Sequence, residues 1–556
     1  MRARLWQAAK GTSALAALAA VAGYHFYEGT KRLVEFNFLV LPIALHYKVT
    51  QIATQQSSER TKREAFARLH SRYAPRSLEI ILRQRGFYVK AAQFCSQLHG
   101  VLPDEYVEAF SVLRDDAPSL PFYQIQPILE RDLGTRISDI FSYVSTKPLA
   151  AASIGQVHAA TLRNGTEVVV KVQYPLAEEQ FYTDMEHFMR LSSIIAPYYV
   201  EILRELRNNF LNEFDYRREA DLQRQAHVNL RKFPGVVVPL PFDRDHPSCR
   251  EFGNLCTKNV LVMERLRGQS VDSWATEMLQ LRAVQEGTTV DEVMAELRAM
   301  SMKDVKKLLP SKLALDTLIA YRGFCDALRN HAAFVYNWTL GWIGSPINYV
   351  HGARPVNIYS VVDTIFRVQA YCIFNDGFFN GDPHAGNVML LDDGRVGLID
   401  WGQVTQFAPK EQALFAKMVV AVADRDEQVV AELAWEMGLE TEHHTEWVAA
   451  KVGTFYCGSH GDDVTGELGG PILFEENIAK IDRVTRSPDV YITALRNLIM
   501  TRCAVSLLGF PFADSAVCMR SAAEACLERF GDSVSTVPCR KVPRPDVEGL
   551  LGHMRS

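Results

Sequence analysis

An acid, an amide and a second acid stand close together in the stretch GDPHAGNVMLLDDGRVGLIDWGQ, which runs from Gly381 to Gln403. Asp382 and Asn387 are five residues apart, and Asp400 opens the triplet Asp-Trp-Gly. A carboxylate can orient or deprotonate an attacking hydroxyl, and carboxylate and amide oxygens are ligands that Mg²⁺ accepts. These residue types predict phosphoryl transfer, with Asp382 as the catalytic residue and Asn387 and Asp400 as metal ligands.

A β-hairpin is expected to bring these groups together. Its strands would be the apolar runs Val388–Leu391 and Val396–Ile399, because the sequence between them, Asp-Asp-Gly-Arg, has the composition of a tight turn. The spacing from Asp382 to Asn387 is that of a kinase catalytic loop, and Asp-Trp-Gly occupies the place of the kinase Asp-Phe-Gly. Asp-Pro and Asp-Gly pairs are also ordinary turn residues, so the hairpin context is what favours a catalytic interpretation.

A second stretch, PLAAASIGQVHAATLRNGTEVVVKVQYP at residues 148–175, predicts a nucleotide site. It fits the kinase glycine-rich loop G-x-G-x-x-G-x-V, with alanine at the first two glycine positions and Gly155 at the third. After an Asn-Gly turn, the strand Val168–Lys171 ends in a lysine that can pair with phosphates; a strand-end lysine in water is the alternative. The apolar strand Val260–Glu264 suits a hinge between two lobes. The predicted nucleotide contacts are Ala150, Ala151, Ala152, Ser153, Gly155, Val157, Lys171, Glu219, Met263 and Glu264. Lys171 is also predicted to be catalytic, together with Asp382.

Carboxylates on a predicted helix could complete this site. Asp215 and Glu219 are four residues apart and face the same way, whereas Glu213 is turned about 200° from Asp215. One of them could pair with the strand-end lysine while another meets a different cation. Charged helix faces are usually solvated, so only the neighbouring motifs support a functional role for these carboxylates.

Length and composition restrict the class of protein. The chain has 556 residues, 48% of them hydrophobic, and a formal charge of −5, which fits a globular core with additions and gives no electrostatic footprint for nucleic acid. Its ten cysteines, among them Cys95, Cys325, Cys372 and Cys503, stand in apolar sequence without a C-x-x-C pair. Buried free thiols in a reducing compartment are therefore expected rather than disulfides or zinc ligands.

The N-terminal region has the composition of a targeting segment. The first 27 residues contain basic residues but no acid, and Ser13–Gly23 is rich in alanine, which predicts a mitochondrial presequence with a membrane anchor nearby. The alanine-rich run is shorter than the roughly 20 residues of a membrane span, and the next apolar stretch, Phe36–Leu45, is interrupted by Pro42. A helix docked on the following domain is the alternative.

Periodic apolar spacing predicts the helices that position the motifs. An amphipathic helical pair is expected at Ser57–Arg85, and a helix at Val361–Phe379 should lead into the loop that holds Asp382. Residues 280–350 have the pattern of an insertion, whose aromatic part, Phe334–Ile347, would mark a partner or membrane surface if it is exposed. Further helices are expected at Lys410–Val422, Glu427–Met437, Thr445–Phe455, Asp489–Leu508 and Ser515–Phe530.

Together these motifs resemble the UbiB family of atypical protein-kinase-like proteins, whose members support coenzyme Q (ubiquinone) biosynthesis. The resemblance covers roughly residues 60–275 and 355–530 and rests on AAASIGQVH, Lys171, the E-x-D element with Glu219, DPHAGN and the Asp-Trp-Gly acid. It implies an α+β, two-lobed protein-kinase-like fold with a small β-rich N-lobe, a larger helical C-lobe and an N-terminal helical extension. The expected segments are the targeting segment and anchor at 1–55, the extension at 56–145, the N-lobe at 146–264, the C-lobe at 265–530 and a loose tail at 531–556.

The resemblance also implies roles for the site residues. Lys171 would pair with Glu219, and Asp382 would be the Asp of the catalytic loop. Asn387 and Asp400 would hold Mg²⁺, with ATP or ADP as the bound nucleotide. Regulation through a phosphorylated activation loop is not supported, because Asn-Gly precedes the catalytic Asp where a regulated kinase has His-Arg.

A lid over the site is implied as well. Lys90 and Gln93, three residues apart on one helix face, would belong to the family's K-x-G-Q element, which folds against Glu213 and Asp215 and blocks access by peptides. Ala92 replaces the glycine of that element and adds a methyl group where the backbone needs close approach. The family is accordingly thought to act as an ATPase or as a small-molecule or lipid kinase, and not on proteins.

We therefore expect an atypical kinase-like ATPase that supports ubiquinone biosynthesis or handles quinone lipids. The expected partners are a nucleotide, a lipid or quinone-precursor ligand, a membrane surface and a biosynthetic protein complex, and the expected location is the mitochondrial inner membrane. Two alternatives stay open. The pattern G-D-x-H-x-G-N followed by I-D-W is also similar to aminoglycoside and choline kinases, although the alanine-rich loop and the lid argue against them. The other alternative is a nucleotide-gated lipid-binding scaffold without turnover.

Overall fold

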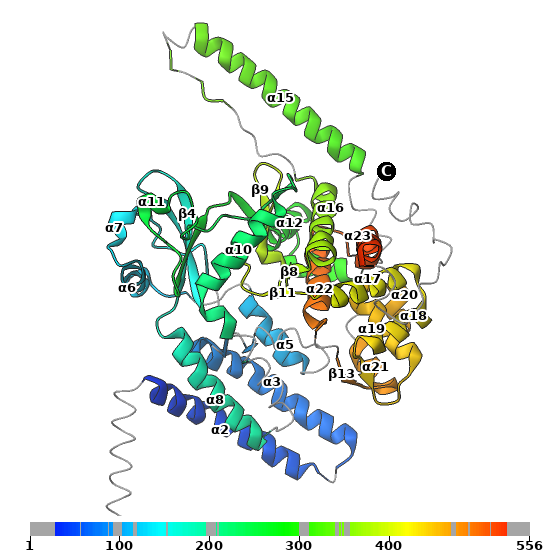
Figure 1. The fold of residues 1–556 in the computed structure, drawn as a ribbon. Helices are drawn as coiled ribbons and strands as arrows, with labels where there is room; N and C mark the ends of the chain where they lie inside the picture. Colours follow the sequence, from blue (N-terminus) through cyan, green and yellow to red (C-terminus); the bar gives the residue numbers. More distant parts are fainter. Residues whose placement is uncertain are drawn as a thin grey trace, which may run out of the picture. The chain divides into compact units, whose positions relative to one another are not determined.

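The computed structural model divides the chain into two compact units (Figure 1). Unit 1 comprises Met1–Arg218 and Pro241–Glu264, and unit 2 comprises Glu219–Leu240 and Arg265–Ser556. Both units combine helices with mainly antiparallel sheets, so the expected two-lobed α+β class is confirmed. The residues that the structure describes are 28–55, 57–86, 88–89, 91–92, 103–114, 119–151, 154–195, 207, 211–299, 311–339, 344–345, 347–349, 356–468, 474–487, 490–511 and 513–530.

An antiparallel sheet forms the centre of unit 1. Its strands lie in the order β1-β3-β4-β6, and β2 pairs with the start of β3. Val168, Val170 and Val172 are fully buried on one face, where they pack against α6 (Phe122–Leu133). Because side chains alternate along a strand, Lys171 points to the opposite face. The strands are β1 (Phe141–Val144), β2 (Ala150–Ala151), β3 (Gly155–Leu162), β4 (Glu167–Gln173) and β6 (Val260–Glu264).

One helix in unit 1 differs from the prediction. The helical pair expected at Ser57–Arg85 is wrong, because α3 is a single helix that includes Pro75. Pro42 lies inside α2 and does not interrupt it. In both helices, burial of one apolar side outweighs the hydrogen bond that an internal proline removes. The helical segments are α2 (Glu28–Ala53), α3 (Glu59–Gln84), α5 (Asp104–Ser111), η1 (Val112–Arg114), α7 (Ile137–Ile140), α8 (Ala177–Ile195), η3 (Leu211–Phe214) and α11 (Cys249–Phe252), while α10 (Tyr216–Leu230) continues into unit 2.

Helices α2 and α3 pack antiparallel, and α2 exposes an apolar face. His46 is hydrogen-bonded to Tyr73, and Tyr47 is hydrogen-bonded to His70, each at 2.8 Å. Residue numbers therefore rise along α2 in the direction in which they fall along α3. The exposed apolar side chains of α2 recur every three or four residues and therefore lie on one face of the helix. This face, called the α2 stripe below, consists of Val34, Phe38, Leu41, Leu45, Val49 and Ile52, which are 42–80% exposed.

Unit 2 contains small sheets surrounded by helices. The predicted hairpin is confirmed as β9 (Val388–Leu391) and β10 (Val396–Leu398), which lie in the sheet order β5-β10-β9-β7. The remaining strands are β5 (Val236–Val237), β7 (Gly268–Ser270), β8 (Phe378–Asn380), which pairs with β11 (Val404–Gln406), and β12 (Glu440–Thr441), which pairs with β13 (Val484–Arg486).

The helices predicted after Gln403 are confirmed as α17, α18, α19, α22 and α23. The helix predicted at Val361–Phe379 is partly wrong: α16 ends at Tyr371, a π-helical turn follows, and Phe378 lies in β8. Gly377, with a φ of 63°, allows the chain to leave the helix there. The helical segments of unit 2 are α12 (Val271–Glu286), α13 (Val290–Ala299), α15 (Lys312–Thr339), α16 (Ile358–Tyr371), η4 (Cys372–Asp376), η5 (Ala385–Asn387), α17 (Pro409–Asp424), α18 (Glu427–Glu436), α19 (Glu446–Cys457), α20 (Asp462–Thr465), η6 (Gly466–Leu468), α21 (Phe474–Ile481), α22 (Ile492–Leu507) and α23 (Ser515–Phe530).

The long helix α15 is largely exposed. Tyr321, Phe324, Phe334 and Trp338 expose 55–74% of their surface, so these aromatic residues of the insertion lie at the surface. Among the helices that the structure describes, none combines the length and the hydropathy that crossing a bilayer requires. The cysteines of the described segments are free thiols, but only four of the eight are buried as predicted. Three are half-buried, and Cys503 is exposed because its neighbours on α22 take the buried side.

Candidate active site

Hydrogen bonds hold the loop around Asp382 against the segment that carries Asp400. The buried Asn380 donates from Nδ2 to the Asp400 carbonyl oxygen at 2.7 Å and accepts from the Asp382 N–H at 2.8 Å. The Asn387 amide donates to the Asp382 carbonyl oxygen at 3.2 Å, and the Ile399 N–H donates to the Asn387 carbonyl oxygen at 3.0 Å. The two acids and the amide predicted from the sequence therefore lie on one hydrogen-bonded frame, and the hairpin joins them as expected.

Asp400 has an unusual backbone conformation. Its φ is 68°, in the left-handed region that few residues other than glycine adopt, although aspartate tolerates it. The Asp400 Oδ1 atom accepts from the Gly402 N–H at 3.1 Å. A β-carbon built on Gly402 would lie 3.4 Å from Asp400 Oδ1 and 3.7 Å from Oε2 of the buried Glu219, so two carboxylates approach the same glycine. Backbone strain beside clustered charges is typical of functional sites.

Trp401 fixes Asp400 from the core side. Its side chain is 2% exposed, and its ring is stacked with that of Phe378 at a centroid distance of 6.3 Å. The indole N–H donates to the Leu398 carbonyl oxygen at 3.3 Å. The tryptophan of the Asp-Trp-Gly triplet is therefore a packing residue that immobilises the neighbouring acid.

The donor atoms beside this loop fit a hard cation. The Asn387 amide N–H is used on the Asp382 carbonyl, which leaves the amide oxygen as a ligand, and Asp400 supplies a carboxylate. Such oxygen donors suit Mg²⁺, which binds through few protein ligands and completes its shell with water and phosphate. Within the described ranges, no group of three or more His, Cys, Asp or Glu side chains could hold a metal ion by itself.

In unit 1, Lys171 faces an aromatic ring. Its Nζ lies 5.0 Å from the ring centroid of Tyr216, which is 1% exposed. Val157 pairs directly with Lys171 across the sheet and so shares its face. A β-carbon on Gly155 would lie 2.5 Å from the Val172 carbonyl oxygen and 2.9 Å from the Tyr216 hydroxyl, so this loop position requires glycine. No motif singles out Tyr216; its place directly after Asp215 is the signal that was available.

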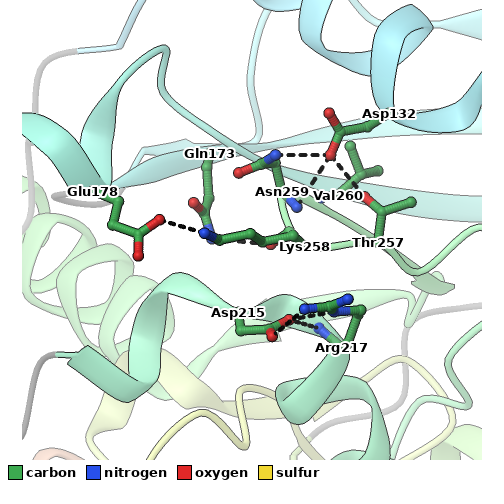
Figure 2. A network of polar contacts seen from close by, with 9 residues as sticks. All are labelled: Asp132, Gln173, Glu178, Asp215, Arg217, Thr257, Lys258, Asn259 and Val260. Carbon is green, nitrogen blue, oxygen red and sulfur yellow. Dashed lines mark hydrogen bonds and ion pairs between the residues drawn. The ribbon is translucent and has the colours of Figure 1, made fainter.

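A polar network around Asp132 fixes the turn before β6 (Figure 2). Tyr216, at the start of α10, is bonded to this turn. Asp132, at the end of α6, accepts from Thr257 Oγ1 at 3.0 Å and from Asn259 Nδ2 at 2.8 Å, which shapes the turn before β6. Within this turn, the Lys258 carbonyl oxygen accepts from the Tyr216 N–H at 3.1 Å. The same turn therefore positions β6, which pairs with the lysine-bearing strand, and the ring that faces the lysine.

The structure describes Glu213 and Asp215, the carboxylates against which the lid is predicted to fold, but it does not describe the lid residues. Asp215 accepts from Nε and Nη2 of Arg217 at 2.9 and 2.7 Å (Figure 2), and these hydrogen bonds lower the pKa of Asp215. Glu213 lies partly buried in η3. Lys90 and Gln93 lie outside the described residues, so their approach to these acids stays a prediction.

Of the other predicted nucleotide contacts, those that the structure describes lie on strands. Ala150 and Ala151 form β2, while Met263 and Glu264 end β6. Ala152 and Ser153 lie outside the described residues. Lys171 and Glu219 belong to different units, and their pairing stays a prediction.

Helix α22 contributes side chains that the motifs did not reveal. Asn497 is fully buried and donates to the Asn380 carbonyl oxygen at 2.6 Å. Arg496 pairs with the Asp382 carboxylate at 3.1 Å. These residues follow the loop by more than a hundred positions, so no local spacing in the sequence points to them.

Comparison with known proteins identifies a kinase-like domain in this chain. The ABC1 atypical kinase-like domain matches residues 112–307 and 338–434, together more than half of the chain, and most of α15 falls between the two segments. The "Uncharacterized aarF domain-containing protein kinase At5g05200, chloroplastic" of Arabidopsis thaliana is 26% identical over 64% of this chain and 53% of its own length. "AarF domain-containing protein kinase 1" of Xenopus tropicalis is 34% identical over 37% of this chain and 38% of its own length. "Probable protein kinase UbiB" of Marinobacter nauticus is 26% identical over 65% of this chain and 53% of its own length.

The chain thus spans about half or less of the length of these relatives. A solved structure of Rv3197 with erythromycin from Mycobacterium tuberculosis aligns with a TM-score of 0.43 at 19% identity, covering 84% of this chain and 98% of that one; a score this low adds nothing to the fold. The domain match is independent of it and includes the alanine-rich loop, the strand lysine, the catalytic-loop acid and the Asp-Trp-Gly triplet. This chain belongs to the UbiB family of ABC1 atypical kinase-like proteins.

Proposed function

We propose that this chain binds ATP with Mg²⁺ and hydrolyses it or transfers its terminal phosphoryl group, in support of ubiquinone biosynthesis. The observation that carries the proposal is the frame in which Asn380 links Asp382 to Asp400, with Asn387 beside them. Phosphoryl transfer depends mainly on positioning and electrostatic stabilisation, and this frame supplies a catalytic carboxylate and two metal ligands in fixed places. Membership of a kinase-like family supports nucleotide binding in general.

Each residue of the site has a role in this proposal. Asp382 orients the attacking hydroxyl or water and accepts its proton. Asn387 and Asp400 would hold Mg²⁺, whose charge offsets that of the nucleotide phosphates when it is bound. Lys171 would pair with the phosphates, and the ring that faces its ammonium restricts where that group can lie.

We also propose that unit 1 binds a mitochondrial membrane surface that carries the lipid or quinone-precursor ligand. The α2 stripe exposes apolar side chains, and the neighbouring helix α3 exposes a row of arginines. An apolar helix face next to basic residues suits an anionic bilayer surface and does not require a membrane span. The quinone-lipid acceptor and a biosynthetic complex are supported by the family resemblance, and the mitochondrial inner-membrane location is supported by the composition of the first 27 residues. The exposed arginines of α3 are Arg68, Arg72, Arg76 and Arg83.

The metal assignment is tested by one substitution and a matched control. Asp400→Asn removes the charge of the proposed metal ligand, and Asp392→Asn makes the same change in the exposed turn of the same hairpin. We expect the affinity for Mg²⁺-ATP to fall at least about tenfold in the first variant, since losing a charge-assisted contact costs about 1.5–3 kcal/mol. The control should bind like the wild type. Equal affinities for the wild type and Asp400→Asn would show that the metal assignment is wrong.

The acceptor and the membrane are tested by ATP hydrolysis with and without anionic vesicles that carry a quinone precursor. We expect the vesicles to raise hydrolysis, and Phe38→Ser with Leu45→Ser to abolish both the stimulation and co-sedimentation. Ile481→Ser with Leu507→Ser, which changes two exposed apolar side chains of unit 2, is the control. Binding of ATP without hydrolysis under either condition would favour the scaffold alternative, and phosphorylation of a soluble alcohol without vesicles would favour the metabolite-kinase alternative.

A further inference from the structure

Arg496 of α22 contacts the loop that carries the proposed catalytic residue and also the segment that follows Asp400. Its Nη2 lies 3.1 Å from Oδ1 of Asp382, and its Nη1 donates to Oε1 of Gln403 at 3.3 Å. The side chains of Arg496 and Asp382 are 37% and 20% exposed, so the pair borders solvent. One guanidinium therefore joins two segments that the proposed function places around the reacting phosphoryl group.

The neighbouring side chains of α22 fit the same loop. Thr493, Arg496 and Asn497 are spaced three and four residues apart and lie on one helix face. A β-carbon on Gly381 would come within 2.4 Å of Thr493 Cγ2, so the loop packs directly on the helix. Asn497 binds the carbonyl of Asn380 from the buried side. The helix thus presents to the loop a buried amide, a close steric contact and a cation at its solvent edge.

We propose that Arg496 is a positioning residue for Asp382, an inference that rests on the proposed phosphoryl transfer. The loop motif DPHAGN contains no lysine or arginine, and among the described side chains no other cation pairs with Asp382. Arg496 occupies Oδ1 and restricts rotation of the carboxylate, which leaves Oδ2 to receive the proton of the attacking hydroxyl or water. The contact with Gln403 holds the guanidinium itself in place.

A double-mutant cycle tests this role. The variants are Arg496→Gln, Arg496→Lys, Asp382→Asn and the combination of Arg496→Gln with Asp382→Asn. Arg486→Gln is the matched control, because it removes an exposed arginine that pairs with Glu440 elsewhere in unit 2. For each full-length protein, the measurements are the Kd for Mg²⁺-ATP, kcat and KM for hydrolysis, and the melting temperature.

We expect Arg496→Gln to lower kcat at least tenfold while the Kd for Mg²⁺-ATP and the melting temperature change little, and Arg496→Lys to restore part of kcat. In the Asp382→Asn background, Arg496→Gln should cause no further loss, because the two residues act through one carboxylate. A kcat that is unchanged, or one that rises because the pair inhibits the enzyme, would overturn the inference. An equal loss in both backgrounds would overturn it as well.

A different result would show that the proposed ATP turnover, and not the role of Arg496, is wrong. A wild-type protein that binds Mg²⁺-ATP but does not hydrolyse it would refute turnover. Hydrogen–deuterium exchange of the peptides that contain residues 378–391 would then decide the role of Arg496, since it needs no catalysis. We expect faster exchange in Arg496→Gln than in the wild type and intermediate exchange in Arg496→Lys, with α17 unchanged. Identical exchange in the three proteins would show that Arg496 does not position this loop.

Discussion

The side-chain amide of Asn380 lies 2.7 Å from the carbonyl oxygen of Asp400, and its own oxygen accepts from the Asp382 N–H at 2.8 Å. One buried side chain thus joins the loop before the hairpin to the segment after it. Asn380 stands two residues before Asp382, the proposed catalytic residue, where a regulated kinase has histidine. In this chain, therefore, an amide couples the positions of the two acids.

Asn380→Ala should lower both stability and activity. It leaves a partly buried carbonyl and a partly buried N–H without their partner, which costs about 1–3 kcal/mol of unfolding free energy. It also releases Asp400, so kcat for ATP hydrolysis should fall more than the unfolding free energy alone explains. Urea unfolding and hydrolysis assays check this, with Gln428→Ala, a loss of an exposed amide on α18, as the control. Normal turnover by a destabilised Asn380→Ala protein would make this contact purely structural.

Lys171→Ala should weaken nucleotide binding and leave the fold intact. Lys171 lies on the sheet face opposite the packed valines, so its removal opens no cavity in that core. The facing ring is a further test: Tyr216→Phe keeps the aromatic surface, whereas Tyr216→Leu loses a cation–π contact of about 0.5–2 kcal/mol. Nucleotide titration should rank the affinities as wild type, Tyr216→Phe, Tyr216→Leu and Lys171→Ala, from highest to lowest. If Lys171→Ala no longer unfolds cooperatively, the lysine is structural.

Gly155→Ala should destabilise unit 1. The added β-carbon would lie 2.5 Å from a backbone carbonyl oxygen of the neighbouring strand, which cannot move without distorting β4. Overpacking of this kind costs about 1–3 kcal/mol. Gly323→Ala on the exposed helix α15 is the control, since nothing lies within 4 Å of its β-carbon. Thermal unfolding should separate the two variants by several degrees, and equal melting temperatures would contradict the close packing.

The sequence patterns predicted the hairpin and the later helices, which short-range interactions along the chain determine. The turn composition around Asp392 and the apolar runs beside it specify a hairpin in a short window, and the later helices follow from their periodicity. The continuous helix α3 was predicted as a helical pair, because local apolar spacing does not show whether tertiary packing keeps a helix intact through an internal proline such as Pro75.

The side chains that support the site could not be predicted in the same way. Asn497 is 117 residues beyond Asn380, and Arg496 is 93 residues beyond Gln403. On α22 they are an ordinary asparagine and arginine, and only the folded contact of the helix with the loop gives them a role. The motifs therefore predict the acids and the amide of the site, while the residues that position them require the structure.

His460 should make the fold sensitive to acid. Its ring is stacked with Phe455 at 4.3 Å, and Nε2 lies 2.9 Å from Nη2 of the buried Arg502. Burial, followed by the charge of Arg502, lowers the pKa of His460 from 6.5 to about 3. Between these two pKa values the unfolded chain binds more protons than the folded chain, so the unfolding free energy falls as the pH drops below about 6.5.

His460→Gln removes this titration and keeps an acceptor for the guanidinium. From pH 7 to pH 5, the wild type should lose about 2 kcal/mol more than His460→Gln, measured by urea unfolding with His331→Gln, an exposed site on α15, as the control. Equal losses in the wild type and His460→Gln would show that the folded protein does not keep this histidine neutral.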